Sequence, residues 1–126
     1  MAAAVTTLMA KKKMLLARAG AAALPPIQKM AFGNGGVDAD GTVIEPENEQ
    51  KTLKNELYRK DITKYEIISD TQIAYYCHLT ESELMGENIS ELALVDSEGD
   101  IVTIKNFRIK QKDGDFSFTF KVNDTM

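Results

Sequence analysis

"ISELALVDSEGDIVTIKNFRIKQKDGDFSFTFKV" (residues 89–122) predicts three β-strands in succession, at 89–95, 101–109 and 116–122. In the last of them, three phenylalanines and a valine alternate with polar residues, so that the apolar side chains point to one face of a sheet. The two connections, DSEGD and KDGD, contain glycine, which tolerates the positive φ of a tight turn. The stretch therefore predicts an antiparallel sheet.

Three further strands are predicted nearer the N-terminus. IQKMAF (27–32) has the alternation of a strand, and ITKYEII (62–68) is followed at once by TQIAYYCHLT (71–80). Because only Ser69 and Asp70 separate the second pair, these two strands are expected to form a hairpin.

Two helices are predicted before and between these strands. Residues 4–20 carry apolar residues at approximately helical spacing, with Thr6 or Thr7 as N-cap and Gly20 as the stop. Pro46 and the acidic residues after it are typical of a first helical turn, which predicts a short second helix at 47–57.

The fold class that these elements indicate is α+β, mainly β. We expect an antiparallel sheet or sandwich of about six strands, with an N-terminal helix and a short second helix. Pro25 and Pro26 force an extended path. The chain is therefore expected to consist of an N-terminal helical segment, 1–24, and a single β-rich domain, 25–126.

Composition narrows the class of protein. The chain has 126 residues, of which 44% are hydrophobic and 27% charged, as expected for one globular domain. Its net charge of −4 gives no overall attraction to nucleic acid or to an anionic membrane. Lys11, Lys12, Lys13 and Arg18 interrupt the apolar N-terminal stretch, which argues against membrane insertion and against a signal peptide.

The glycine-rich stretch AFGNGGVDADG (31–41) is the one with most resemblance to a ligand-binding loop. It lacks the lysine and hydroxyl residue of a phosphate loop, and its glycines do not open a helix. Asp38, Asp40 and Gly41 match part of a calcium loop, but the spacing of the following acids and the flanking elements do not fit. We therefore interpret the stretch as a turn.

The rest of the sequence shows no pattern that would bring catalytic or metal-binding side chains together. Cys77 is the one cysteine and His78 the one histidine, and as neighbours in a strand they point to opposite faces. We expect no cofactor, no metal and no enzymatic activity.

The order of segments along the chain resembles the phage tail-collar fibre protein family. The resemblance rests on AFGNGG (31–36), NELYR (55–59) and ISELAL (89–94) leading into DSEGD (96–100), and it spans about residues 10–122. It implies the N-terminal, particle-proximal domain of a tail fibre of contractile-tailed phages and prophages. It also implies a structural virion component that binds baseplate or tail-fibre proteins, assembled in the bacterial cytoplasm. A homotrimer is expected on this resemblance alone.

The predicted interface lies on the N-terminal helix, because a body of six strands leaves its apolar residues incompletely covered. Arg59, which follows Tyr58, is a candidate for a structural or interfacial ion pair, and a solvated arginine without such a role is the open alternative. The candidate interface residues are Val5, Leu8, Met9, Leu15, Leu16, Tyr58 and Arg59.

A second function remains open at this point: a carbohydrate- or cell-surface-binding module built on a β-sandwich. Such a module would display aromatic rings on one flat face for stacking on sugars. The sequence has no tryptophan, and its tyrosines and phenylalanines mostly alternate as core residues.

Overall fold

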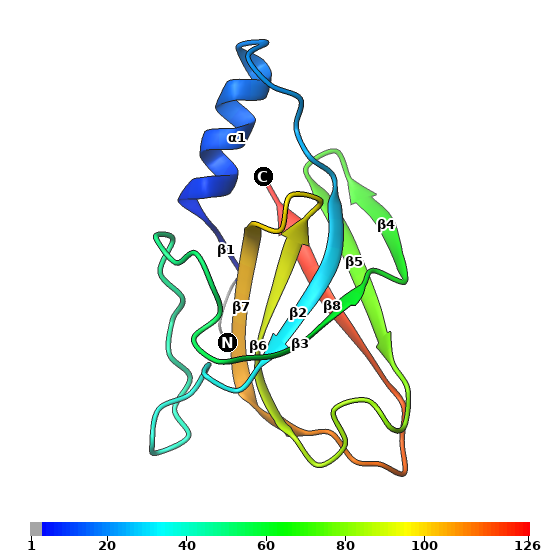
Figure 1. The fold of residues 1–126 in the computed structure, drawn as a ribbon. Coiled ribbons are helices and arrows are strands. Elements are labelled where there is room, and N and C mark those ends of the chain that lie inside the picture. The colour runs from blue at the N-terminus through cyan, green and yellow to red at the C-terminus, as the bar shows by residue number, and fades with distance from the viewer. Residues whose placement is uncertain (1–3) are drawn as a thin grey trace.

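The computed structural model describes residues 4–126, which form two antiparallel sheets and one helix (Figure 1). In chain order the elements are β1 Val5–Thr6, α1 Leu8–Arg18, β2 Ile27–Gly33, β3 Glu56–Asp61, β4 Lys64–Ser69, β5 Gln72–Leu79, β6 Asn88–Asp96, β7 Ile101–Gln111 and β8 Phe118–Thr125. The larger sheet has the strand order β1-β7-β6-β2-β3 and the smaller one β4-β5-β8. The mainly β, antiparallel prediction is confirmed.

The main core lies between the two sheets. It contains Met30 and Phe32 from β2, Leu92 and Leu94 from β6, Cys77 and Leu79 from β5, and Phe120 and Val122 from β8. Side chains of β5 and β8 contribute at every second position, as the alternating pattern of the sequence predicts. The two sheets therefore bury their facing sides as a sandwich does.

A second, smaller core covers the other side of the larger sheet. Ala31, Ala93 and Val95 point to this side, and Leu53, from the long connection between β2 and β3, packs over them. As a result β6 is buried on both faces from Ile89 onward, although its sequence alternates.

The predicted second helix at 47–57 is wrong. The chain makes a turn at 47–50, where the Gln50 amide donates to the Glu47 carbonyl, and then passes Leu53 into the smaller core. Residues from Glu56 onward form β3, which pairs with β2. Pairing with an existing strand supplies these residues with backbone hydrogen bonds, and this outweighs the local helix signal.

The predicted count of six strands is also low, because the chain has eight in the described residues. The two additional strands, β1 and β3, flank the larger sheet. The N-terminal helix is shorter than the predicted 4–20, since Val5 and Thr6 pair with Ile104 and Thr103 of β7 instead of joining the helix.

Candidate assembly surface at the N-terminal helix

Helix α1 begins at a well-defined cap. The Thr7 hydroxyl accepts a hydrogen bond from the Ala10 amide at 3.2 Å and donates one to the Ile101 carbonyl at 2.6 Å. Thr7 is fully buried, so one side chain both caps the helix and joins it to the start of β7. Thr6 and Thr7 were both predicted as candidates for this cap, and Thr7 is the N-cap in the structure.

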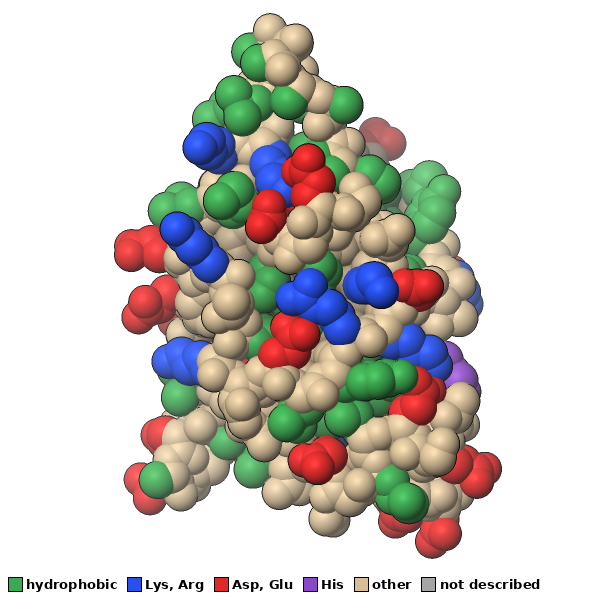
Figure 2. All heavy atoms as spheres, in the orientation of Figure 1, with side chains coloured by type: hydrophobic (Ala, Val, Ile, Leu, Met, Phe, Trp, Pro, Cys, Tyr) green, Lys and Arg blue, Asp and Glu red, His purple; other side chains and the backbone are tan. Residues whose placement is uncertain are grey.

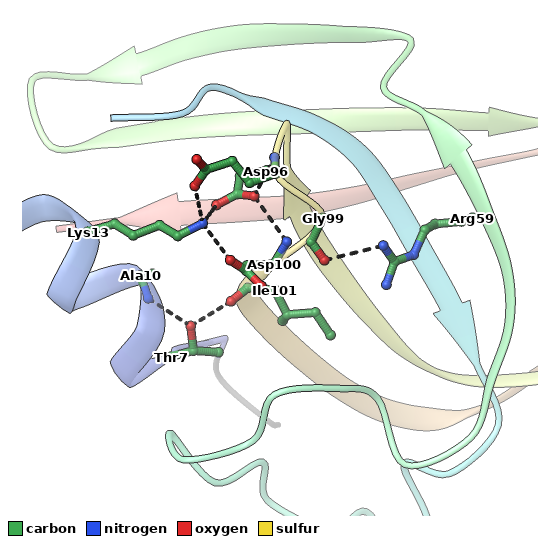
Figure 3. A network of polar contacts seen from close by, with 9 residues as sticks. Thr7, Ala10, Lys13, Arg59, Asp96, Gly99, Asp100 and Ile101 are labelled. Atoms are coloured by element: carbon green, nitrogen blue, oxygen red, sulfur yellow. Dashed lines mark hydrogen bonds and ion pairs between the residues drawn. The ribbon is translucent and has the colours of Figure 1, made fainter. Parts of the chain in front are cut away.

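Lys13 attaches the middle of α1 to the turn between β6 and β7 (Figure 3). Its ammonium lies 2.6 Å from Asp96, 2.8 Å from Glu98 and 2.7 Å from Asp100. These three carboxylates are close enough together to hold a metal ion, but the Lys13 Nζ contacts all three of them. The cluster is therefore an internal ion-pair network that holds the helix in place.

The protonation of Lys13 reflects this network. Burial by itself lowers the pKa of the ammonium group, but the hydrogen bonds to the three carboxylates outweigh burial and raise the pKa above the usual lysine value. Lys13 therefore keeps its positive charge at neutral pH.

The opposite face of α1 is uncovered. Ala10 is the one buried residue of the helix, whereas Leu8, Leu15 and Leu16 are 47%, 62% and 39% exposed. These leucines are seven and eight residues apart, so they share one side of the helix. Lys11 and Lys12 fall on the same side and are also exposed. We call Leu8, Lys11, Lys12, Leu15 and Leu16 the helix face.

The helix face projects from the body. Figure 1 shows α1 beyond one end of the larger sheet, and Figure 2 shows hydrophobic side chains gathered at that end of the molecule. Leu24, 52% exposed, follows the helix and adds to this apolar area. Burying the exposed parts of these leucines against a partner would contribute on the order of 3 kcal/mol.

The other predicted interface residues of the N-terminal segment lie less open than the leucines. Val5 is half-buried in β1, opposite Ile104. Met9 is also half-buried and lines a hollow of about 370 Å³ shared with Glu49 and Gln50.

Tyr58 and Arg59 lie on β3, away from the helix face. The Tyr58 ring packs near Phe32 in the main core, with 6.4 Å between ring centroids. Arg59 forms an ion pair with Glu56 at 2.9 Å on its own strand and donates to the Gly99 carbonyl at 3.4 Å (Figure 3). Because Gly99 belongs to the turn that Lys13 binds, β3 and α1 are joined to the same β6–β7 turn.

The Tyr58 hydroxyl takes part in a second polar cluster. It donates a hydrogen bond to Glu83, which also accepts from the Lys60 ammonium at 2.5 Å. Burial raises the pKa of the Glu83 carboxyl, but the hydrogen bonds from Lys60, from the Thr80 amide and from Tyr58 outweigh burial and lower it to about 2. Cys77, close by, is fully buried, and this burial raises the pKa of its thiol to about 11. The thiol is thus protonated and unreactive at neutral pH.

The glycines of the AFGNGG stretch permit close packing more than they make a turn. At Gly36 a Cβ atom would overlap the Ser90 carbonyl oxygen, and at Gly33 and Gly35 it would overlap the Glu91 side chain. Only farther on, at Gly41, does the backbone adopt a positive φ, of 81°. There Asp38 Oδ1 accepts from the amides of residues 40 and 42, which is an ordinary turn arrangement.

Glu91 is a buried charged residue that sequence reasoning missed as a structural centre. Its carboxylate has no exposed surface and accepts from the amides of Gly35 at 2.8 Å, Asn55 at 2.9 Å and Lys54 at 3.0 Å. The signal was present in the sequence, because Glu91 occupies an apolar face of a predicted strand together with Ala93 and Val95. A carboxylate in that position requires donors, and the glycine-rich stretch supplies one of them.

Lys13 was also missed, since the sequence shows it as the end of a run of three lysines. Its distinguishing signal is its spacing from the cap: it lies six residues after Thr7 and three after Ala10, on the inward side of the helix. In the described part of the chain, no helix has the length and apolar character needed to cross a membrane.

Comparison with known proteins places the chain in a family. The family model described as phage tail-collar fibre protein, N-terminal, matches residues 1–117. No curated protein and no solved structure matches the chain.

Proposed function

The chain belongs to the phage tail-collar fibre protein family, and on this premise we propose that it joins a tail fibre to the baseplate of a contractile-tailed phage, prophage or phage-tail-like particle. Membership of the family assigns it a structural role in a phage tail. In this proposal it is a virion protein that is assembled into the tail in the bacterial cytoplasm. It works by binding other tail proteins and not by catalysis.

The observation that carries the proposal is the uncovered helix face. Leu15 and Leu16 are held outward because Thr7 and Lys13 attach the opposite side of α1 to the body. A helix that is fixed by buried polar contacts and exposes leucines is suited to docking into an apolar groove. Lys11 and Lys12, between the leucines, favour a partner groove with acidic residues at its rim.

The oligomeric state is part of the same proposal. In keeping with the resemblance to trimeric tail fibres, we propose a homotrimer in the assembled particle. Tyr58 and Arg59 are then candidates for contacts between subunits, since Arg59 remains about one-third exposed in its ion pair with Glu56.

The test is incorporation of variants into tails. Leu15→Glu/Leu16→Glu places two charges on the helix face without touching Thr7 or Lys13, so the protein is expected to fold but to be missing from purified particles. The matched control is Ile67→Glu/Ile68→Glu on β4, where both side chains are exposed as well. Normal incorporation of the helix variant, or equal loss of both variants, would overturn docking through α1.

The sugar-binding alternative finds less support. Among residues 4–126 the exposed aromatic side chains are Tyr65 and Phe116. Tyr65 pairs with Tyr75, which in turn pairs with Val122 of β8. Phe116 lies six residues before Val122 in the chain, so the two exposed rings lie well apart along the sheet. They do not make a flat aromatic face on which a sugar could stack.

A further inference from the structure

Strand β8 has one free edge. In the described residues it pairs with β5 alone. On the β4 side of β5, the Tyr76 carbonyl accepts a hydrogen bond from the Thr63 amide at 2.8 Å, and the His78 amide donates one to the Thr63 hydroxyl at 2.9 Å. Since backbone groups alternate in an antiparallel pair, the intervening residues of β5 bond to β8. The N–H and C=O groups of Thr119, Lys121 and Asn123 therefore point to the free edge.

A groove of about 400 Å³ runs along this edge, between β8 and the larger sheet. It is lined by Leu92, Lys105, Phe107, Lys110 and residues 118–121, and we call it the edge groove. Leu92 and Phe120 are buried at its base, while Phe107 and Phe118 are half-buried. The groove thus offers apolar side-chain contacts next to unused backbone donors and acceptors.

The charged residues that line the groove are all positive. Lys105, Lys110 and Lys121 line it, and no carboxylate does. None of these three lysines forms an ion pair with any residue of the described range 4–126. In a chain of net charge −4, such a group of unpaired lysines favours an acidic ligand.

We propose that the edge groove binds an extended acidic segment of another polypeptide, which adds to β8 as a fourth strand of the smaller sheet. The backbone of the segment would bond to Thr119, Lys121 and Asn123. Its apolar side chains would cover Phe107 and Phe118, and its carboxylates would pair with the three lysines.

A second copy of this chain is a poorer occupant of the groove. Pairing of β8 with β8 of another copy would bring the lysine-lined edges together, and like charges on facing strands are destabilising. Lysines on a free strand edge also guard against such self-association. Prevention of self-association by lysines does not require aromatic residues at the base of the groove. Binding of an acidic strand, in contrast, uses both the lysines and the aromatic residues.

The first experiment measures binding of a capped peptide in which glutamate alternates with valine, by fluorescence anisotropy. The expected result is binding that weakens as salt is raised and is far weaker for the matched lysine–valine peptide. N-methylation of the peptide backbone is expected to abolish binding, because it removes the donors needed for strand addition. Equal binding of the two peptides, insensitivity to N-methylation or no binding would overturn the proposal.

The second experiment locates the binding. Lys105→Glu/Lys110→Glu/Lys121→Glu is expected to weaken binding of the glutamate peptide by about tenfold or more, since three charge pairs are lost, and to bind the lysine peptide instead. The control variant, Lys51→Glu/Lys54→Glu/Lys64→Glu, has the same charge change at exposed positions outside the edge groove and the helix face, and it is expected to bind as the original does.

Amide hydrogen exchange of the unaltered protein provides a readout that needs no variant. Addition of the glutamate peptide is expected to protect the Thr119, Lys121 and Asn123 amides. Loss of peptide binding in the control variant would show that the lysines attract the peptide only through the overall charge. Self-association of the charge-reversed variant without binding of the lysine peptide would show that the three lysines only prevent pairing between copies. Either result would overturn the proposal. Because the edge groove is separate from the helix face, failure here leaves docking through α1 untouched.

Discussion

Gly36 has no space for a side chain, because its Cα faces the Ser90 carbonyl on β6 and its amide donates to the Ser90 hydroxyl at 2.9 Å. Gly36→Ala is therefore expected to lower the free energy of unfolding by about 3 kcal/mol, the upper end of the cost of overpacking. Gly41→Ala is the matched control: the added Cβ meets open space and only the positive φ is unfavourable, at a cost of about 1 kcal/mol. Urea unfolding measures both variants, and equal losses would contradict the close-packing role of Gly36.

Glu83 makes stability depend on pH at the acidic end. Its folded pKa of about 2 lies below the ordinary value of 4.5, so its contribution is complete above pH 4.5 and is lost as the pH falls toward 2. The contribution amounts to about 3 kcal/mol at most. In Glu83→Gln, stability at neutral pH is expected to drop and the slope between pH 4.5 and 2 to flatten, as followed by thermal unfolding across pH.

The control for this pH effect is Glu81→Gln, at an exposed position two residues away. It is expected to keep both the stability and the slope of the original protein. An unchanged slope in Glu83→Gln would show that its hydrogen bonds with Lys60 and Tyr58 do not govern acid unfolding.

At the scale of elements, α1 depends on its contacts with the body. A helix of eleven residues is marginal in isolation, and α1 buries only Ala10. Lys13→Ala leaves Asp96, whose side chain is 1% exposed, without its counter-charge. We expect a loss of about 3 kcal/mol in unfolding free energy and faster amide exchange along α1.

Lys12→Ala is the matched control for that variant, because it makes the same change of residue and helix propensity one position away, at an exposed site. Hydrogen-exchange mass spectrometry compares the two. Equal protection of α1 in both variants would mean that the three carboxylates do not hold the helix.

The elements that the sequence predicted well are those whose signal is local. Strands β2, β4, β5, β6, β7 and β8 each carry an alternating run or a glycine turn, and all six form. Strand β1 has only two residues and exists because β7 offers an edge to pair with. Strand β3 was not predicted, and the helix expected at 47–57 ran into its first two residues. Only the tertiary structure places Leu53 in the smaller core and Leu57 in β3.

The candidate site was predictable in part for the same reason. Leu15 and Leu16 could be named from helical spacing, and the structure leaves both exposed. The attachments of the helix, between Lys13 and the β6–β7 turn, join residues more than eighty positions apart, and no local pattern encodes that proximity. The edge groove likewise depends on which strand ends the smaller sheet, and the sequence left strand order open.

The molecule as a whole is a two-sheet body that carries two separate surfaces of different character. The helix face offers exposed leucines around two lysines, and the edge groove offers backbone groups, aromatic rings and lysines. A structural protein of a phage tail has neighbours to bind, and under our two proposals each surface would bind a different one. Incorporation into the tail is proposed to depend on the helix face.

Lysine-specific cross-linking of purified tails, read by mass spectrometry, probes docking through α1, because Lys11 and Lys12 lie within the helix face. These two lysines are expected to cross-link to a different tail polypeptide, whereas Lys64, which is exposed and lies outside both surfaces, is expected to do so far less. Absence of the chain from the tails would contradict docking through α1. The same cross-links of Lys11 and Lys12 in intact tails as in the isolated protein, with none to another polypeptide, would also contradict it.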